Sequence, residues 1–232
     1  MIETLSAFWD FLKKPKLLKL SKDKKSLWRD LLWLLLLDIL FATLILSTYC
    51  ILVYFKMIKE YVQVFDIMKK FGLAITILLV CIFAPIIEEF LFRWHLRKKY
   101  LSIYFVCFTL GLISNYFINS SFLTWPVYIF FLFVALIVQG YFKRIDMRRR
   151  LVFHRRSFGY LFYYAAIIFG LTHLGNIKDL TLSDPAFPLF VSSQIFTGLS
   201  LGFIRIKYGL GYSMLLHGCF NFILVLLTFF FS

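Results

Sequence analysis

The sequence predicts an all-α membrane protein, a polytopic bundle of about seven transmembrane helices. Three observations predict this fold class. Hydrophobic residues make up 61% of the 232 residues, and the mean hydropathy is +0.83, whereas soluble domains average about 45–50% apolar residues. The apolar residues form long unbroken runs of the length that a membrane helix needs, without the alternation of barrel strands. The basic residues lie between these runs.

Seven spans are predicted, and their order along the chain sets the sidedness. They cover about 31–55, 71–93, 101–118, 124–142, 157–175, 187–205 and 210–231. If the N-terminus lies inside, the inner segments hold 21 of the 26 Lys and Arg residues, and the outer segments hold the other five. Because Lys and Arg are concentrated in cytoplasmic loops of membrane proteins, we expect a cytoplasmic N-terminus.

The first 30 residues are predicted to be a basic segment on the membrane surface, ahead of a single transmembrane domain at 31–232. Met1 to Leu12 carries apolar residues at helical spacing, and Pro15 is expected to end that helix. The basic residues of this segment are expected to attract anionic lipid. Because the positive charges flank membrane spans, the net charge of +14 indicates lipid contacts and no nucleic-acid partner.

The first of three polar motifs holds Glu88, Glu89 and Arg93 at the end of the second span. Ionised residues inside a bilayer cost about 2.5–3.5 kcal/mol, so they indicate pairing or function. Glu89 and Arg93 are four residues apart, so they share a helix face and are expected to pair. Glu88 points about 100° away, which leaves it for acid–base chemistry. Pro85 is expected to remove a backbone hydrogen bond and kink the helix; a span that ends in interfacial acids is the alternative.

The second motif ends at His173, and the third joins His217 and Asn221. His217 and Asn221 are four residues apart and therefore lie on one helix face. Gly170 and Gly175 flank His173 and are expected to let helices approach closely. Each motif alone also fits a structural interpretation, a hydrogen-bonded core histidine in one case and an interhelical hydrogen bond in the other.

Three further polar residues are assigned structural or surface positions. Asp38 lies early in the first span and is expected to reach the interface or pair with a nearby base. His95 and His154 fall in basic loops and are expected at the surface.

Together the three motifs resemble those of the CAAX protease and bacteriocin-processing family (CPBP, also called Abi), which includes the eukaryotic type II CAAX prenyl endopeptidase. The family pattern is EExxxR, then FxxxH, then HxxxN or HxxxD, each in a membrane helix. The matching residues are Glu88, Glu89 and Arg93, then Phe169 and His173, then His217 and Asn221. The resemblance covers about residues 80–225. It departs from the family in an extra pair of spans, about 101–118 and 124–142, between the first two motifs.

The resemblance implies a multi-pass cell-membrane endopeptidase that hydrolyses a peptide bond in a membrane-associated peptide or protein. A bacteriocin or pheromone precursor and a CAAX-like C-terminus are the implied substrates. The richness in Phe, Ile and Lys is typical of an AT-rich bacterial genome, where protein prenylation is not expected. A small peptide is therefore the favoured substrate.

The resemblance also implies a role for each motif. Glu88 would be the general base, and His173 would help to hold and polarise the attacking water. His217 and Asn221 would donate hydrogen bonds to the tetrahedral oxyanion.

Glu89 and Arg93 would form the structural pair that orients Glu88. The same residues also allow a metal, because two histidines and a glutamate suit a catalytic zinc. No HExxH motif occurs, and a metal-free glutamate mechanism fits the residues at least as well.

Two other functions fit the same residues. A non-catalytic bacteriocin self-immunity protein would use them as a structural polar network. A small transporter would use Glu88 or His173 as a proton relay, although the sequence has no repeated halves.

Overall fold

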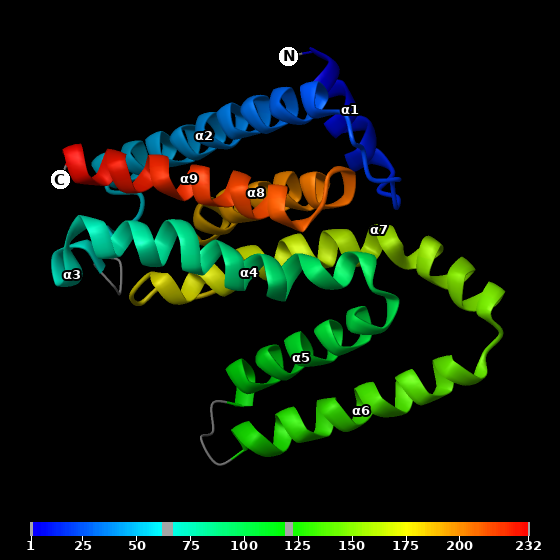
Figure 1. Ribbon diagram of the computed structural model, residues 1–232. Helices are drawn as coiled ribbons and strands as arrows, with labels where there is room; N and C mark the ends of the chain where they lie inside the picture. The colour runs from blue at the N-terminus through cyan, green and yellow to red at the C-terminus, as the bar shows by residue number, and fades with distance from the viewer. Residues whose placement is uncertain (1, 62–66, 119–122, 232) are drawn as a thin grey trace.

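A computed structural model describes residues 2–61, 67–118 and 123–231, which form helices joined by short connections (Figure 1). The helices are α1 (Ile2–Lys13), α2 (Lys24–Tyr54), α3 (Ile67–Thr76), α4 (Ala84–Arg93), α5 (Lys99–Ile118), α6 (Thr124–Arg144), α7 (Met147–Thr172), α8 (Phe187–Lys207) and α9 (Leu210–Phe231). A π-helix, η1 (Ile77–Phe83), joins α3 to α4. Two 3-10 turns, η2 (Trp94–Arg97) and η3 (His173–Asn176), follow α4 and α7.

Seven stretches of the described residues are long and apolar enough to cross a membrane, so the chain is an integral membrane protein. They are Lys24–Tyr54, Met68–Arg97, Tyr100–Ile118, Thr124–Arg144, Met147–Asn176, Phe187–Lys207 and Leu210–Phe230. Each overlaps one predicted span, which confirms the all-α class and the span number. The first and fifth begin earlier than predicted because the side chains of Asp23 and Asp146 cap α2 and α7 beyond the apolar runs.

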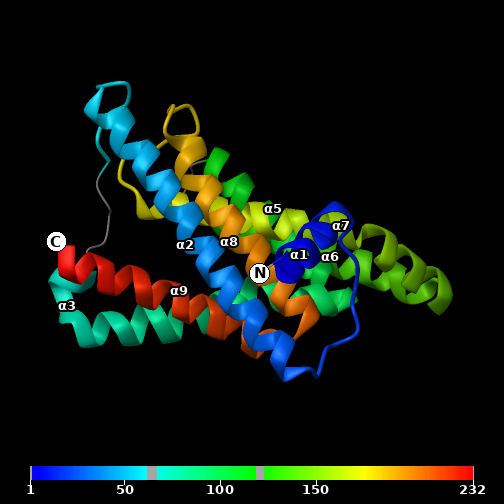
Figure 2. The ribbon, with the colours of Figure 1, turned by 90° about the horizontal axis from the view of Figure 1, so that it is seen from above.

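The helices stack from α2 at one edge to α6 at the other (Figure 1). α8 packs on α7, α2 and α9, and α4 packs on α9. Seen from above, α2 and α8 run side by side and cross α4 and α9 obliquely (Figure 2). α6 packs on α5 at the far edge of the bundle, and its Phe142 ring lies 5.1 Å from that of Phe153 on α7.

Small residues allow α7 and α8 to pack closely, as predicted for Gly170. A Cβ built at Gly170 would lie 2.5 Å from Cγ1 of Ile195, and one at Gly198 would lie 3.3 Å from the main chain of Ala166. The prediction was wrong for Gly175, because nothing lies within 4 Å of a Cβ built there.

α1 is the helix predicted at the N-terminus, and it ends at Lys13, before Pro15. Phe8 and Phe11 pack edge-on against Phe203 of α8. Its other face, including Trp9, is exposed. The helix is therefore amphipathic and docked on the bundle, while its place at a membrane surface stays a prediction.

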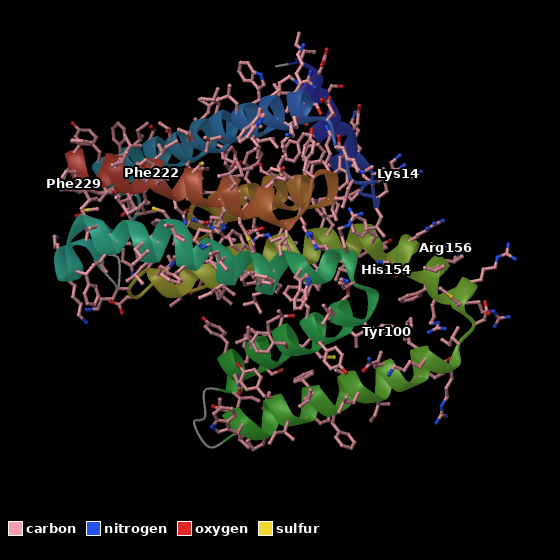
Figure 3. All side chains as sticks on the ribbon, viewed as in Figure 1. Lys14, Tyr100, His154, Arg156, Phe222 and Phe229 are labelled. Carbon is pink, nitrogen blue, oxygen red and sulfur yellow. The ribbon has the colours of Figure 1, made fainter. Side chains whose placement is uncertain are left out.

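Basic side chains gather at one end of the bundle. Arg97 donates to a main-chain carbonyl in the last turn of α8 at 2.8 Å, and Lys207 pairs with the buried Asp30 at 2.6 Å. Figure 3 shows Lys14 and Arg156 at this same end. This grouping agrees with the predicted inner segments, and which membrane face the end meets stays a prediction.

Candidate active site

The main chain before α4 sets the direction of the two acids. Pro85 has no N–H, so an upstream carbonyl lacks its helical partner. The stretch Ile77–Phe83 is π-helical, and in that register each carbonyl pairs with the N–H five residues on. The carbonyl left over is that of Val80, and it accepts a hydrogen bond from Nδ2 of Asn221 at 2.8 Å. The backbone irregularity predicted at Pro85 is therefore joined to α9 by an asparagine.

Gly218 brings α9 close to η1. A Cβ at this position would lie 2.6 Å from the carbonyl oxygen of Cys81, a distance at which one of the two backbones must shift. The glycine therefore allows the backbone contact that carries His217 and Asn221 to α4 and η1.

Glu89 is fully buried and has three partners among the described residues. Arg93 lies 2.9 Å from its Oε1, which confirms the predicted i,i+4 pair. Nδ1 of His217 lies 3.1 Å from the same oxygen, and the Ser213 hydroxyl donates to Oε2. These contacts satisfy a buried charge that is strongly destabilising when left unpaired.

Glu89 was predicted to orient Glu88 together with Arg93. Its direct contact is with the imidazole of His217, so it orients that ring. A carboxylate only accepts hydrogen bonds, so Nδ1 of His217 is the donor in this contact. Nε2 of His217 then faces Glu88 and lies 3.7 Å from its Oε2.

Glu88 and His173 complete the cluster. Nδ1 of His173 lies 2.7 Å from the Phe169 carbonyl, which can only accept, so Nε2 is directed elsewhere. It lies 3.7 Å from Oε2 of Glu88. The Glu88 side chain is 28% exposed, and Oε2 has no hydrogen-bond partner among the described residues. One acid and two imidazoles from α4, η3 and α9 thus meet at a single oxygen.

Two cavities meet at His173. The first, the Glu88 cavity, measures about 370 Å³, and α4 and α5 supply much of its apolar wall. Its other lining residues include Leu91, Phe92, Phe108 and Leu112. The second, the Tyr49 cavity, measures about 360 Å³ and lies between α2, α8 and the end of α7. Its polar lining residues include Tyr49, Tyr61, Ser193 and Gln194.

Phe169 packs beneath the cluster and touches its charged and polar members. The Arg93 guanidinium lies 3.8 Å from the centre of the Phe169 ring, a favourable cation–π geometry. The rings of His173 and His217 lie 4.5 Å and 5.8 Å from it. The phenylalanine of the second motif is thus the apolar support on which the other two motifs rest.

Residues 70–223 match a family model described as "Type II CAAX prenyl endopeptidase Rce1-like". The chain belongs to this family. Membership makes it a membrane protease of the CAAX-protease type that acts on a peptide or protein. The matched range includes all three motifs and the α5–α6 hairpin. No curated protein and no solved structure matches the chain.

Sequence reasoning missed one member of the network in this Rce1-like chain. Ser213 is fully buried, and its hydroxyl contacts Glu89 and the Leu201 carbonyl. Ser213 precedes His217 by four residues, as His217 precedes Asn221. This helical spacing puts all three on one face of α9, so the spacing alone could have identified Ser213 as a member of the network.

Three polar residues lie in other surroundings than predicted. His95 is buried and stacks on Phe105 with ring centres 3.8 Å apart, because α5 packs over the η2 turn. Asp38 is also buried, and its partner is the Ser200 hydroxyl at 2.8 Å rather than a base. His154 is half-buried and lines a cavity between α5, α6 and α7.

The cluster holds the residue types of a zinc site without the arrangement that a metal requires. Glu88, His173 and His217 are residue types found at catalytic zinc sites. Among the described residues, however, no group of three or more His, Cys, Asp or Glu side chains is arranged to hold a metal ion.

Proposed function

We propose that this Rce1-like protein hydrolyses a peptide bond in a small membrane-associated peptide, with Glu88 as general base. The observation that carries the proposal is the position of Oε2 of Glu88, 3.7 Å from Nε2 of both His173 and His217. These distances are too long for direct hydrogen bonds. Each distance leaves room for a water about 2.9 Å from Oε2 and from an imidazole nitrogen.

In the proposed reaction, Glu88 removes one proton from this water as the water oxygen attacks the peptide carbonyl carbon. His173 accepts a hydrogen bond from the water at Nε2, because its Nδ1–H is directed to the Phe169 carbonyl. The tetrahedral oxyanion then collapses, the C–N bond breaks, and protonated Glu88 gives its proton to the leaving amine. Positioned acid–base catalysis of this kind contributes about 10²–10⁴ in rate.

We assign His217 the role of a hydrogen-bond donor to the tetrahedral oxyanion. Its Nδ1–H is directed to Glu89, so Nε2 is the atom that faces the charge developing beside Glu88, and the predicted oxyanion contact requires a proton on that nitrogen. Glu89 and Arg93 thus act by holding the His217 ring. Asn221 uses one amide hydrogen on the Val80 carbonyl, and the second is the one that the predicted oxyanion contact requires. Removing one oxyanion donor typically costs about 10²–10³ in rate.

The two cavities support a substrate that passes His173 on both sides. The Glu88 cavity has an apolar wall and suits an apolar side chain next to the scissile bond. The Tyr49 cavity offers hydroxyl and amide groups and suits a polar segment on the other side of that bond. A bacteriocin or pheromone precursor meets this description, and a CAAX-like C-terminus is the second candidate of the same class.

Comparative peptidomics of cells that carry wild-type protein or Glu88→Gln tests the proposal. We expect a membrane-associated precursor to accumulate in Glu88→Gln and in His173→Ala cells. Purified wild-type protein should cleave this precursor at least about 10²-fold faster than Glu88→Gln. Thermal unfolding should be unchanged, because Glu88 is partly exposed and both imidazole nitrogens lie 3.7 Å from its carboxylate, beyond direct hydrogen bonding. Asp10→Asn, a matched loss of an exposed carboxylate on α1, should behave as wild type.

A folded Glu88→Gln protein with no precursor accumulation and a full phenotype would overturn the proposal in favour of non-catalytic bacteriocin self-immunity. Chelation separates the two chemistries that the residues fit. In the metal-free mechanism, 1,10-phenanthroline leaves the cleavage rate unchanged. Loss of activity that added Zn²⁺ restores would instead assign a zinc ion to Glu88, His173 and His217.

A further inference from the structure

The α5–α6 hairpin and α7 enclose a groove that the proposed reaction does not use. α6 and α7 are joined by only two residues, yet they diverge from that point, and α5 lies between them (Figure 1). The enclosed space measures about 530 Å³, which is within the usual range for small-molecule sites. Residues of all three helices line it.

The groove is polar at one end and apolar along the rest. Tyr100, Arg150 and His154 line the polar end, where Figure 3 shows Tyr100 and His154. The apolar walls are formed by Ile103, Val106, Val138, Phe142, Phe153 and Leu161. From Arg150 to Leu161 the groove follows α7 for about 17 Å at 1.5 Å per residue. This is close to half of a hydrocarbon core of about 30 Å, the depth of one leaflet.

Arg150 is positioned to bind an anion at the polar end. Its NH1 donates to the Tyr100 hydroxyl at 2.6 Å. Its Nε is shielded from solvent and has no hydrogen-bond partner among the described residues, and such a donor is costly until an acceptor reaches it. Seven Lys and Arg residues lie within 143–156. The one acid of this segment, Asp146, is engaged in capping α7.

We propose that this groove binds one anionic phospholipid, with the phosphate at Arg150 and an acyl chain between α5, α6 and α7. The apolar walls suit hydrocarbon and the basic end suits an anion, and a membrane lipid combines both in one molecule. A peptide segment fits less well, because its main-chain polar groups would lie unpaired against apolar walls. The bound lipid fills the space between the diverging helices, and it thereby holds α5, which also forms a wall of the Glu88 cavity.

Native mass spectrometry of the full chain in detergent tests this site. The protein is titrated with phosphatidylglycerol or with phosphatidylcholine that carries the same acyl chains. We expect one phosphatidylglycerol to bind at least about ten times more tightly, since a hydrogen bond to a charged group is worth about tenfold or more in affinity. Arg150→Gln should lower that affinity at least about tenfold. Arg148→Gln, the same change on an exposed neighbour outside the groove, should leave it unaltered.

Two further binding measurements locate the acyl chain and distinguish a lipid site from a site for soluble phosphate. Val138→Trp fills the groove without a change in charge and should weaken both lipids. Glycerol phosphate, which has the headgroup without the chains, should not bind measurably. Should Arg150→Gln fail to fold, as judged by thermal unfolding in lipid-free detergent, Arg150→Lys should keep its fold and lose part of the preference for phosphatidylglycerol.

Four outcomes would overturn the proposal. Equal affinity for the two lipids would exclude recognition of the headgroup. Equal losses in Arg150→Gln and Arg148→Gln would show that affinity follows surface charge alone. Undiminished binding by Val138→Trp would place the chain elsewhere, and tight binding of glycerol phosphate would show a site for soluble phosphate.

Discussion

Replacement of Gly218 by Ala tests whether the contact between α9 and η1 positions the catalytic groups. The added Cβ would lie 2.6 Å from the Cys81 carbonyl oxygen, and ordinary contact begins at 3.4 Å. Because the opposing atom belongs to the main chain, the two helices must separate by about 0.8 Å, the difference between these distances. His217 and Asn221 share α9 with Gly218 and would move with it. A displacement near 1 Å costs about 10²-fold in rate, and overpacking costs about 1–3 kcal/mol of stability.

The assay uses the precursor that accumulates in Glu88→Gln cells, incubated with each purified variant, together with thermal unfolding in detergent. Gly211→Ala is the matched control. It makes the same change in the same helix, and nothing lies within 4 Å of a Cβ built there. We expect this control to keep the wild-type rate and melting temperature.

Wild-type cleavage by Gly218→Ala would refute the reasoning, because the site would then tolerate the separation of α9 from η1. A lower melting temperature with an unchanged rate would show that the contact serves folding alone. Equal losses in both variants would trace the effect to the flexibility of α9 rather than to its approach to Cys81.

Two further predictions concern the buried network around Glu89, and a third concerns Asp184 in the connection between η3 and α8. Glu89→Gln should lower the free energy of unfolding in denaturant by about 3–5 kcal/mol, because it leaves Arg93 charged and unpaired; Arg93→Met in the same chain should recover part of this loss. Ser213→Ala should cost about 1–3 kcal/mol by the same measurement, since it removes a donor to a buried carboxylate, and wild-type stability would argue against that bond. Asp184 lies outside the spans, and the main-chain N–H of Thr181, 2.6 Å from its carboxylate, lowers its pKa below the usual 3.8. Its stabilisation is therefore fully present well above the unfolded pKa of 3.8 and is lost as the pH falls from there through the lower pKa of the folded state. As the pH is lowered below 3.8, the protection of the Thr181 amide from hydrogen exchange, corrected for the intrinsic rate, should decrease. In Asp184→Asn this protection should be independent of pH.

Helical periodicity explains why the pairs within each motif could be predicted from the sequence. Spacings of four residues fix which side chains share a face, and the pair of Glu89 with Arg93 follows from spacing alone. The partner across helices does not follow from spacing. Glu89 holds His217, and Asn221 holds the Val80 carbonyl, because α4 and η1 lie against α9 in a register that only packing determines.

Hydropathy predicted the spans for an equally local reason, since each span alone must present apolar side chains over the thickness of a bilayer. Burial within the bundle depends on neighbours that are distant in sequence. The sequence predicts His95 to be a loop residue at the surface, whereas in the structure α5 packs over it and Phe105 lies against its ring. Asp38 was likewise predicted to reach the interface or pair with a base, whereas in the structure the Ser200 hydroxyl of α8 donates to it.

The π-helical stretch Ile77–Phe83 takes up one residue of chain length without turning the two ends of this span relative to each other. A π register accommodates one residue more than an α register, so deletion of a single residue there would restore ordinary winding and leave both ends in phase. In an ordinary α-helix the same deletion turns all following residues by about 100° and draws them in by about 1.5 Å. A residue lost from this stretch would therefore leave Glu88 and Glu89 directed at His173 and His217, whereas a residue lost between the stretch and Glu88 would turn both acids away.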